Sequence, residues 1–327
     1  MGNTHLANTH EPITPDQRTH KGASPYLLLS VTMVLWGSAF ASSKAVVEHV
    51  PHSVGAFLRF AGGALALLVA LRLTGGRQQA EQRQVARRAR GLAAGAGVLG
   101  VFGYNALFFW GLSLAPSLDA GILIPVMSPV LTSTFLLLTG KERANPARVA
   151  GLGLGLAGAV LFFLGSNGGG HAGSSRLLGD LVFLLSAVCW AAYTLVGPRV
   201  LAGLDPLRAT TYATCAGALL LGLLAAPDLG RTAWGSLPAG LWANTAFLAI
   251  GPAAVANLLY YRGVGTVGPA KASLMMFNVP VVNTLCATLL LGESFGPLQG
   301  AGAAVLVLGA LVAVTQRNRT PAAARTR

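Results

Sequence analysis

Apolar residues in this chain fall into long blocks that are separated by short polar segments. Each block is close to the roughly 20 residues that a helix needs to cross a bilayer. The blocks predict membrane-spanning helices at about residues 26–48, 53–72, 91–112, 117–139, 147–165, 177–197, 207–226, 239–260, 268–291 and 297–315. The pattern therefore predicts an all-α polytopic membrane protein with ten transmembrane helices.

Two stretches of the chain repeat each other. Asn105–Glu142 and Asn257–Glu293 each begin with Asn, followed by an aromatic pair and a Gly, and each end with Pro-Val, an apolar run and a Glu. Self-similarity across about half the chain indicates an internal duplication. Each half then holds five helices, so the second half enters the membrane from the opposite side. We therefore predict two inverted five-helix repeats, the arrangement that alternating-access transporters use.

The polar segments set the boundaries of these parts. Residues 1–25 have the composition of a disordered tail, and the Gly- and Ser-rich residues 166–176 are expected to connect the halves. The first repeat is then 26–165 and the second 177–316, followed by a basic tail at 317–327. If the helices alternate in direction, most of the 23 Lys and Arg residues lie on the same side as the N-terminus. Basic residues favour the cytoplasmic side, so we expect both termini in the cytoplasm.

The first span has a rival interpretation. Ala39-Phe40-Ala41 resembles a signal-peptidase site, which would make the preceding residues a cleaved signal peptide. The tail before this span is long and weakly charged, and the duplication requires the helix. We therefore expect the segment to remain as the first transmembrane helix.

Composition and missing motifs exclude several classes of protein. Of the residues, 53% are hydrophobic and 10% are charged, whereas about a quarter are charged in ordinary soluble domains. The net charge of +13 is scattered between the apolar blocks and does not indicate a nucleic-acid partner. No His lies in a span, the three cysteines have no motif spacing, and the chain has no GxxxxGK[ST] loop for ATP. We therefore expect no enzyme activity, no metal site and no cofactor.

Several short motifs occur at positions typical of one transporter family. They are Trp36-Gly37-Ser38-Ala39-Phe40 with Lys44, Arg59, Gly179-Asp180 with Trp190-Ala191-Ala192-Tyr193, Pro280 with Gly292-Glu293, and Pro129 with Glu142. Together with the ten spans and the duplication, they resemble the EamA family of the drug/metabolite transporter superfamily over about residues 26–316. The chain departs from the family pattern at Gly140-Lys141-Glu142, where a Lys separates the usual Gly-Glu pair.

The resemblance implies a carrier of the plasma membrane that exports amino acids, related metabolites or toxic compounds, without identifying the substrate. We predict a secondary transporter that exports amino acids or related small metabolites by alternating access. Two alternatives stay open: a multidrug or toxic-compound exporter, and a membrane scaffold that transports nothing. Coupling to a proton gradient, exchange and facilitated diffusion are equally open.

Three basic residues lie in or at the ends of spans and are candidates for binding substrate: Arg59, Lys44 and Lys271. A charge within a span is costly and usually faces a cavity or a partner. Arg59 is the deepest of the three, and an arginine can hold a carboxylate through two parallel hydrogen bonds. The structural alternatives are an Arg59 bonded to helix carbonyls or to an acid, and lysines that reach back to the interface. If Arg59, Lys44 and Lys271 instead face the transport pathway, they make it electropositive and favour a substrate that bears a carboxylate.

Aromatic residues supply a second set of candidates. Trp36, Trp190 and Tyr193 lie where they could line a cavity and stack on an apolar substrate, although packing in the core is the ordinary fate of such residues. Tyr260 and Tyr261 are expected near a cytoplasmic helix end, where they fit an interfacial aromatic belt.

The remaining candidates are acids and prolines. Asp119 and Asp180 lie near outer helix ends and are candidates for proton coupling, with capping of the sixth span as the structural alternative for Asp180. Pro129 and Pro280 occupy equivalent positions in the two repeats, and paired helix kinks there would suit gates. A fixed bend is the alternative.

Small residues are spaced for close helix packing. The pairs Gly91/Gly95, Gly151/Gly155 and Gly296/Gly300 have the small-xxx-small spacing. Packing within one chain accounts for such pairs, and a homodimer is left open.

Overall fold

The computed structural model describes residues 24–74, 83–140, 145–166, 170–267, 272, 275–294 and 296–315. Every secondary-structure element in the described ranges is helical. The helices are α1 (Pro25–Val47), α2 (His52–Thr74), α3 (Arg83–Gly97), η2 (Val98–Gly103), α4 (Tyr104–Leu114), α5 (Ser117–Leu138), α6 (Pro146–Ser166), α7 (Gly170–Leu201), α8 (Pro206–Leu229), η3 (Trp234–Ser236), α9 (Ala239–Leu248), η4 (Ala249–Ala256), α10 (Asn257–Val267), α12 (Asn278–Leu291) and α13 (Pro297–Thr315).

Helices long and apolar enough to cross a membrane make up most of this structure. Seven helical segments of 22 to 29 residues qualify within the described ranges, and three shorter apolar helices accompany them. Seven of the ten expected spans match the long segments, and the spans expected at 147–165, 268–291 and 297–315 overlap the three shorter helices. The count of ten membrane crossings therefore stays a prediction. Leu73, Leu138 and Leu289 are among the most exposed side chains, at 82%, 83% and 78%. An apolar surface of this kind is favourable in contact with lipid tails and unfavourable in contact with water. The chain is a multi-pass membrane protein.

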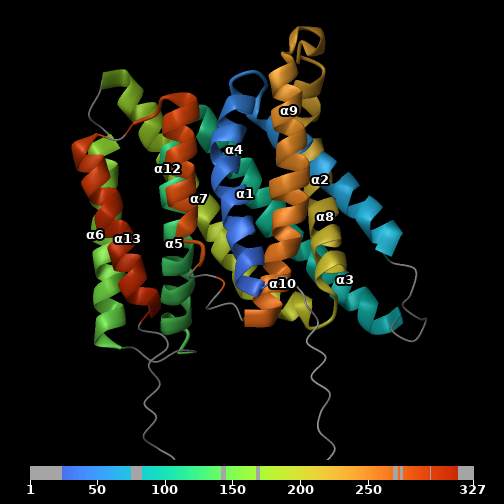
Figure 1. The fold of residues 1–327 in the computed structure, drawn as a ribbon, viewed down its shortest axis with the longest axis horizontal. Coiled ribbons are helices and arrows are strands. Elements are labelled where there is room, and N and C mark those ends of the chain that lie inside the picture. The colour runs from blue at the N-terminus through green and yellow to red at the C-terminus, as the bar shows by residue number, and fades with distance from the viewer. Residues whose placement is uncertain are drawn as a thin grey trace, which may run out of the picture.

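The two halves of the chain pack against each other in matched pairs. Helix α1 of the first half packs on α12 of the second, and α7, the counterpart of α1, packs on α5, the counterpart of α12. Helix α2 packs on α8, and α6 packs on α13, so each of these pairs joins two counterparts. Figure 1 shows the helices as one bundle, with α6 and α13 side by side at one edge.

The contact between α6 and α13 depends on glycine. A Cβ atom added at Gly158 would lie 2.2 Å from the backbone nitrogen of Leu306, and one at Gly309 would lie 2.2 Å from that of Gly155. The expected Gly151/Gly155 pair is therefore used within the chain, where the two backbones touch. Gly91, Gly95 and Gly296 have no neighbour within 4 Å at that position.

Three helix starts differ from the expected boundaries. Helix α12 begins at Asn278, after the expected start of the ninth span at 268, with Met276 and Phe277 in a turn before it. The other two helices begin earlier than expected. Helix α7 begins at Gly170, so the expected connector 166–176 is helical over most of its length. Asp180 consequently lies well inside α7, and the expectation that it caps this helix is wrong. Helix α3 begins at Arg83, upstream of the expected span at 91. Low-propensity and charged residues continue these helices beyond the apolar block, because hydropathy marks only the part that lies in lipid.

The third and eighth spans each contain a π-helical segment, η2 in the first half and η4 in the second. In both halves the Asn that begins the sequence repeat closes the segment. The side-chain amide of Asn105 donates to the carbonyl of Val101 at 2.9 Å. That of Asn257 donates to the carbonyls of Ala253 at 2.9 Å and Pro252 at 3.2 Å. A π-helical turn displaces carbonyls from their usual partners, and the two Asn side chains compensate for this.

Candidate functional site

A cavity lies where helices of both halves meet. Residues of α1, α2, η2, α4, α5, α7, α8, α10 and α12 line it, and it holds about 720 Å³ of space free of atoms, counting the part open to the exterior. Seven of the residues that line it are aromatic, and we call them the aromatic wall: Trp36, Phe40, Phe60, Tyr104, Phe108, Trp190 and Tyr193. A largely apolar pocket with a few polar groups is the usual form of a small-molecule site.

The aromatic wall is a connected set of ring contacts. The ring of Trp36 meets that of Trp190 edge-on with centroids 5.4 Å apart. Tyr104 lies between Trp190 and Phe108, at centroid distances of 5.1 Å and 5.8 Å. Trp36, Trp190 and Tyr193 all line the cavity, so the structure places these three sequence candidates together. Tyr104 and Phe108 join them from one face of α4, four residues apart.

Among the described residues, Arg59 is the one charged residue that lines the cavity. It is 6% exposed, and its guanidinium lies 5.1 Å from the ring centre of Phe60 and 6.0 Å from that of Phe108. Its Nη1 donates a long hydrogen bond of 3.4 Å to the hydroxyl of Ser43. Its Nε has no protein partner, and no carboxylate of the described residues pairs with it. The structural alternatives for Arg59, helix carbonyls or a nearby acid, are therefore not what holds this side chain.

Two further polar atoms in the cavity wall have no protein partner. They are the indole nitrogen of Trp190 and the side-chain oxygen of Asn105. Both residues are buried, at 9% and 1% exposure. Buried polar groups are nearly always hydrogen-bonded, so each exception needs an explanation. Here three such atoms, with that of Arg59, belong to the lining of one cavity.

A tyrosine pair lies at one end of the aromatic wall. The hydroxyl of Tyr261 donates a hydrogen bond to that of Tyr193. The ring of Tyr260 packs on that of Trp36 at 4.9 Å, and both Tyr260 and Tyr261 are buried. The interfacial belt expected for these two tyrosines is therefore wrong, because the sequence pattern does not tell which face of α10 turns inward.

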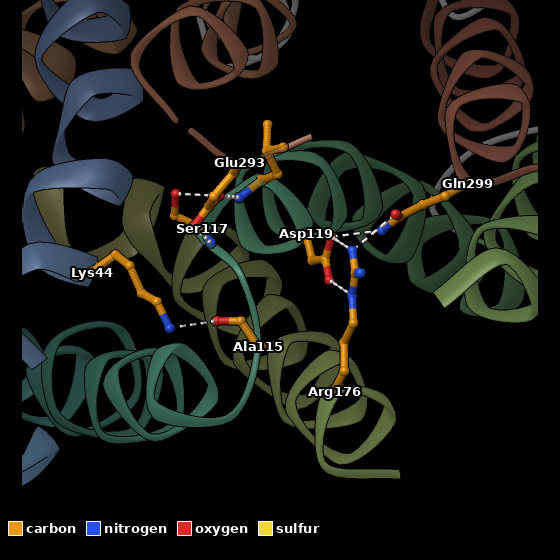
Figure 2. A network of polar contacts seen from close by, with 8 residues as sticks. Lys44, Ala115, Ser117, Asp119, Arg176, Glu293 and Gln299 are labelled. Carbon is orange, nitrogen blue, oxygen red and sulfur yellow. Dashed lines mark hydrogen bonds and ion pairs between the residues drawn. The ribbon is translucent and has the colours of Figure 1, made fainter. Parts of the chain in front are cut away.

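Lys44 lies away from the cavity, at the end of α4. Its Nζ donates to the carbonyls of Leu112 at 2.8 Å and Ala115 at 3.3 Å, as Figure 2 shows for Ala115. These carbonyls have no partner within their own helix, and a cation at a helix C-terminus is stabilising. The structure gives Lys44 this capping contact and does not place it among the lining residues.

Glu293 caps the helix that follows. Its carboxylate accepts hydrogen bonds from the backbone nitrogens of Ser117 and Leu118 and from the Ser117 hydroxyl, at 2.8 to 2.9 Å (Figure 2). Gly292 directs it there, because a φ of +67° ends α12 and turns the chain. Gly140 has the same φ at the end of α5, while Glu142 lies outside the described residues.

The N-terminal end of α5 carries a second polar cluster (Figure 2). Asp119, which is fully buried, accepts two hydrogen bonds from Arg176 at 2.7 and 2.8 Å and one from Gln299 at 2.6 Å. Arg176 also donates to the side-chain oxygen of Gln299 at 2.8 Å. We call Ser117, Asp119, Arg176, Glu293 and Gln299 the α5 network. It joins α5 to α7, to α13 and to the end of α12, all from the second half.

The other candidates are placed as follows. Asp180 is fully buried within α7. Pro129 lies within the continuous helix α5, whereas Pro280 lies in the first turn of α12, where proline interrupts no hydrogen bond. Lys271 lies outside the described residues. The residues that sequence reasoning missed are Asn105, Tyr104 and Phe108, although Asn105 opens the repeat that revealed the duplication.

The chain resembles known transporters along most of its length. It is 29% identical over 288 residues to the uncharacterized transporter YyaM of Bacillus subtilis, covering 88% of this chain and 92% of that protein. It is 29% identical over 290 residues to a protein of Streptantibioticus cattleyicolor named "Probable terminal-alkyne amino-acid exporter", covering 87% and 91%. It is 31% identical over 229 residues to the aromatic amino acid exporter YddG of Ancylobacter novellus, covering 68% and 76%.

A solved structure and a family model agree with these relatives. The fold matches one crystal structure with a TM-score of 0.58 and 25% sequence identity, over 90% of this chain and 99% of that chain. The model of the EamA-like transporter family matches twice, over residues 23–164 and 177–315, which correspond to the two halves. The chain therefore belongs to the EamA-like transporter family.

Proposed function

We propose that this protein is a secondary transporter that exports α-amino acids or related small carboxylates from the cytoplasm. Two relatives are named as amino-acid exporters, and the family is one of transporters. We further propose ten transmembrane helices in two inverted five-helix repeats with both termini cytoplasmic. The matched packing of the two halves and the twofold family match support this arrangement.

The observation that carries the proposal is Arg59 in the cavity. A guanidinium in a largely apolar site has lost much of its hydration, and one long hydrogen bond to Ser43 is all that the described residues offer in its place. A carboxylate that enters the cavity would supply a counter-charge to Arg59 and could accept a hydrogen bond from its unpaired Nε. The rings around it would contact the apolar part of the substrate. A cationic drug would instead meet a like charge, so the cavity favours the carboxylate over the multidrug alternative.

Movement of the two halves would carry the substrate across. In this proposal the cavity is the central site. Helix α5, which contains Pro129, and helix α12, which contains the equivalent Pro280, change their packing between states. Asp119 and Asp180 are the buried acids available to a proton-coupled mechanism. A scaffold without transport would have no need for a buried, unpaired arginine in a cavity.

The test is solute flux in proteoliposomes, with labelled amino acids and cationic dyes, with and without a pH gradient. We expect saturable amino-acid flux that falls roughly tenfold to a hundredfold in Arg59→Gln, the range for a hydrogen bond to a charged group. Arg208→Gln is the matched control, because Arg208 pairs with Asp205 at a half-exposed site outside the cavity. Flux of dyes but not of amino acids would instead establish the multidrug function, and no flux of either would support a scaffold.

A further inference from the structure

We propose that the side-chain oxygen of Asn105 is a second substrate anchor, which accepts a hydrogen bond from the ammonium group of the substrate. This inference rests on the proposed function and narrows it. Arg59 alone would accept any small carboxylate. An acceptor in the same cavity adds a requirement for a donor, so the preferred substrate class is the α-amino acid zwitterion with an aromatic or large apolar side chain.

The orientation of the Asn105 amide follows from its hydrogen bond. Its nitrogen donates to the carbonyl of Val101 at 2.9 Å. A carbonyl can only accept, so the atom that faces Val101 must be the nitrogen, and the oxygen must point elsewhere. The oxygen is buried and no protein group donates to it. A buried acceptor without a donor is costly, and a donor brought in by a ligand removes that cost.

The second step is the position of this oxygen relative to Arg59. Asn105 and Phe108 are three residues apart on α4, and both line the cavity. The guanidinium of Arg59 lies over the ring of Phe108 at 6.0 Å. A cationic donor on α2 and a neutral acceptor on α4 therefore line the same pocket, and these two helices pack against each other. The two polar groups of an α-amino acid are attached to one carbon and need two such anchors side by side.

The third step is the rest of the cavity wall. Tyr104, the residue before Asn105, contacts Trp190 with ring centroids 5.1 Å apart. The ring of Trp190 in turn contacts that of Trp36. A side chain that extends away from the two anchors would meet these rings, which favour aromatic and large apolar groups. The indole nitrogen of Trp190, also without a protein partner, adds a donor and no acceptor. The Asn105 oxygen is therefore the group that would select for a donor on the substrate.

The protein contains a matched control for Asn105. Asn257 follows the other π-helical segment, donates to the equivalent carbonyls and lines the same cavity. The two side chains differ at the oxygen. That of Asn105 is buried and has no hydrogen-bond donor, whereas that of Asn257 is not in this state. If Asn105 only supports the π-helical segment, substitution at either position should have the same kind of effect. If its oxygen binds substrate, only Asn105 should affect selectivity.

The experiment compares labelled phenylalanine with its deamino analogue 3-phenylpropanoate in proteoliposomes. In Asn105→Leu we expect the ratio of phenylalanine to analogue flux to fall about tenfold or more, because a hydrogen bond from an ammonium is lost. Asn105→Asp, which keeps an acceptor, should retain the ratio. Asn257→Leu should leave the ratio unchanged even if both fluxes fall. Quenching of the cavity tryptophans by each compound supplies the same ratio where a variant no longer transports.

An unchanged ratio in Asn105→Leu, or an equal change in Asn105→Leu and Asn257→Leu, would overturn the inference. Its failure is distinguishable from that of the proposed function. If both compounds are transported and both fluxes depend on Arg59, the carboxylate site stands and only the ammonium anchor is wrong. If the wild-type protein transports neither, or if Arg59→Gln changes nothing, the proposed function and this inference both fail.

Discussion

The cavity and the α5 network each contain an arginine, and the two arginines differ in their hydrogen bonding. Arg176 in the α5 network makes three hydrogen bonds of 2.7 to 2.8 Å to Asp119 and Gln299. Arg59 in the cavity makes one of 3.4 Å. Arg176, which has more hydrogen bonds, is also more exposed: 25% of its side chain is accessible, whereas Arg59 as a whole residue is 6% exposed. Burial would lead one to expect the reverse.

The difference separates polar groups that hold the structure together from polar groups that are available to a ligand. In the α5 network, donors and acceptors satisfy one another and join one end of α5 to the second half of the chain. In the cavity, Arg59, Asn105 and Trp190 each retain an atom without a protein partner. Loss of a network residue should therefore lower stability, whereas loss of a cavity residue should change transport and leave stability intact.

The largest effect is expected for Asp119→Ala. The substitution leaves Arg176 and Gln299 without their acceptor, and breaking a buried ion pair costs about 3–5 kcal/mol. Partial exposure of Arg176 should bring the loss to the lower end, about 3 kcal/mol. Unfolding in detergent measures it. Arg208→Gln, which removes the half-exposed pair with Asp205 and leaves Asp205 as the N-cap of α8, is the control and should cost less than about 1 kcal/mol. Equal losses in the two variants would contradict a structural role for the α5 network.

Arg59→Gln should give the opposite pattern. Carboxylate flux should fall by the equivalent of about 1.5–3 kcal/mol, while the unfolding temperature stays unchanged or rises, because a buried charge without a counter-ion has been removed. Flux and thermal unfolding of the same preparation check both parts. A loss of stability as large as that of Asp119→Ala would show that Arg59 is structural after all.

Lys44→Met should resemble the network variants, with a smaller effect. The carbonyls at the end of α4 lose a cationic partner, which costs about 0.3–1 kcal/mol at a helix terminus. Because Lys44 is not among the cavity-lining residues, amino-acid flux should be kept. Lys44→Arg, which keeps the charge, is the control for stability. A selective loss of carboxylate flux in Lys44→Met would restore Lys44 as a substrate-binding residue.

Ser43→Ala should have the smallest effect. Its hydroxyl is the single hydrogen-bond partner of Arg59 within the described part of the chain, at the long distance of 3.4 Å. A bond this long is weak, so we expect a change in stability below about 0.5 kcal/mol and flux within about twofold of wild type. The same two measurements apply. A severe loss of flux would mean that Ser43 positions the guanidinium, and the cavity would then be less different from the α5 network.

Some features of the site could be predicted from sequence and others could not. Arg59 was a candidate because a charge inside an apolar span is costly. Trp36, Trp190 and Tyr193 were candidates because they lie where rings could line a cavity, and all four residues do line it. The pairing of Asp119 with Arg176 was not predicted, because it joins residues 57 positions apart on separate helices. The capping role of Lys44 depends in the same way on where the end of α4 lies relative to α1.

The sequence by itself determined the membrane location, the order of the helices and the division into two halves. These follow from the length of the apolar blocks and the repeated pattern, which are local or periodic properties. Only the tertiary structure decided which polar atoms are paired, that two spans contain π-helical turns, and that Tyr260 and Tyr261 face inward. The physical reason is that hydrogen-bond partners and helix rotation depend on packing between distant segments, and composition carries no record of either.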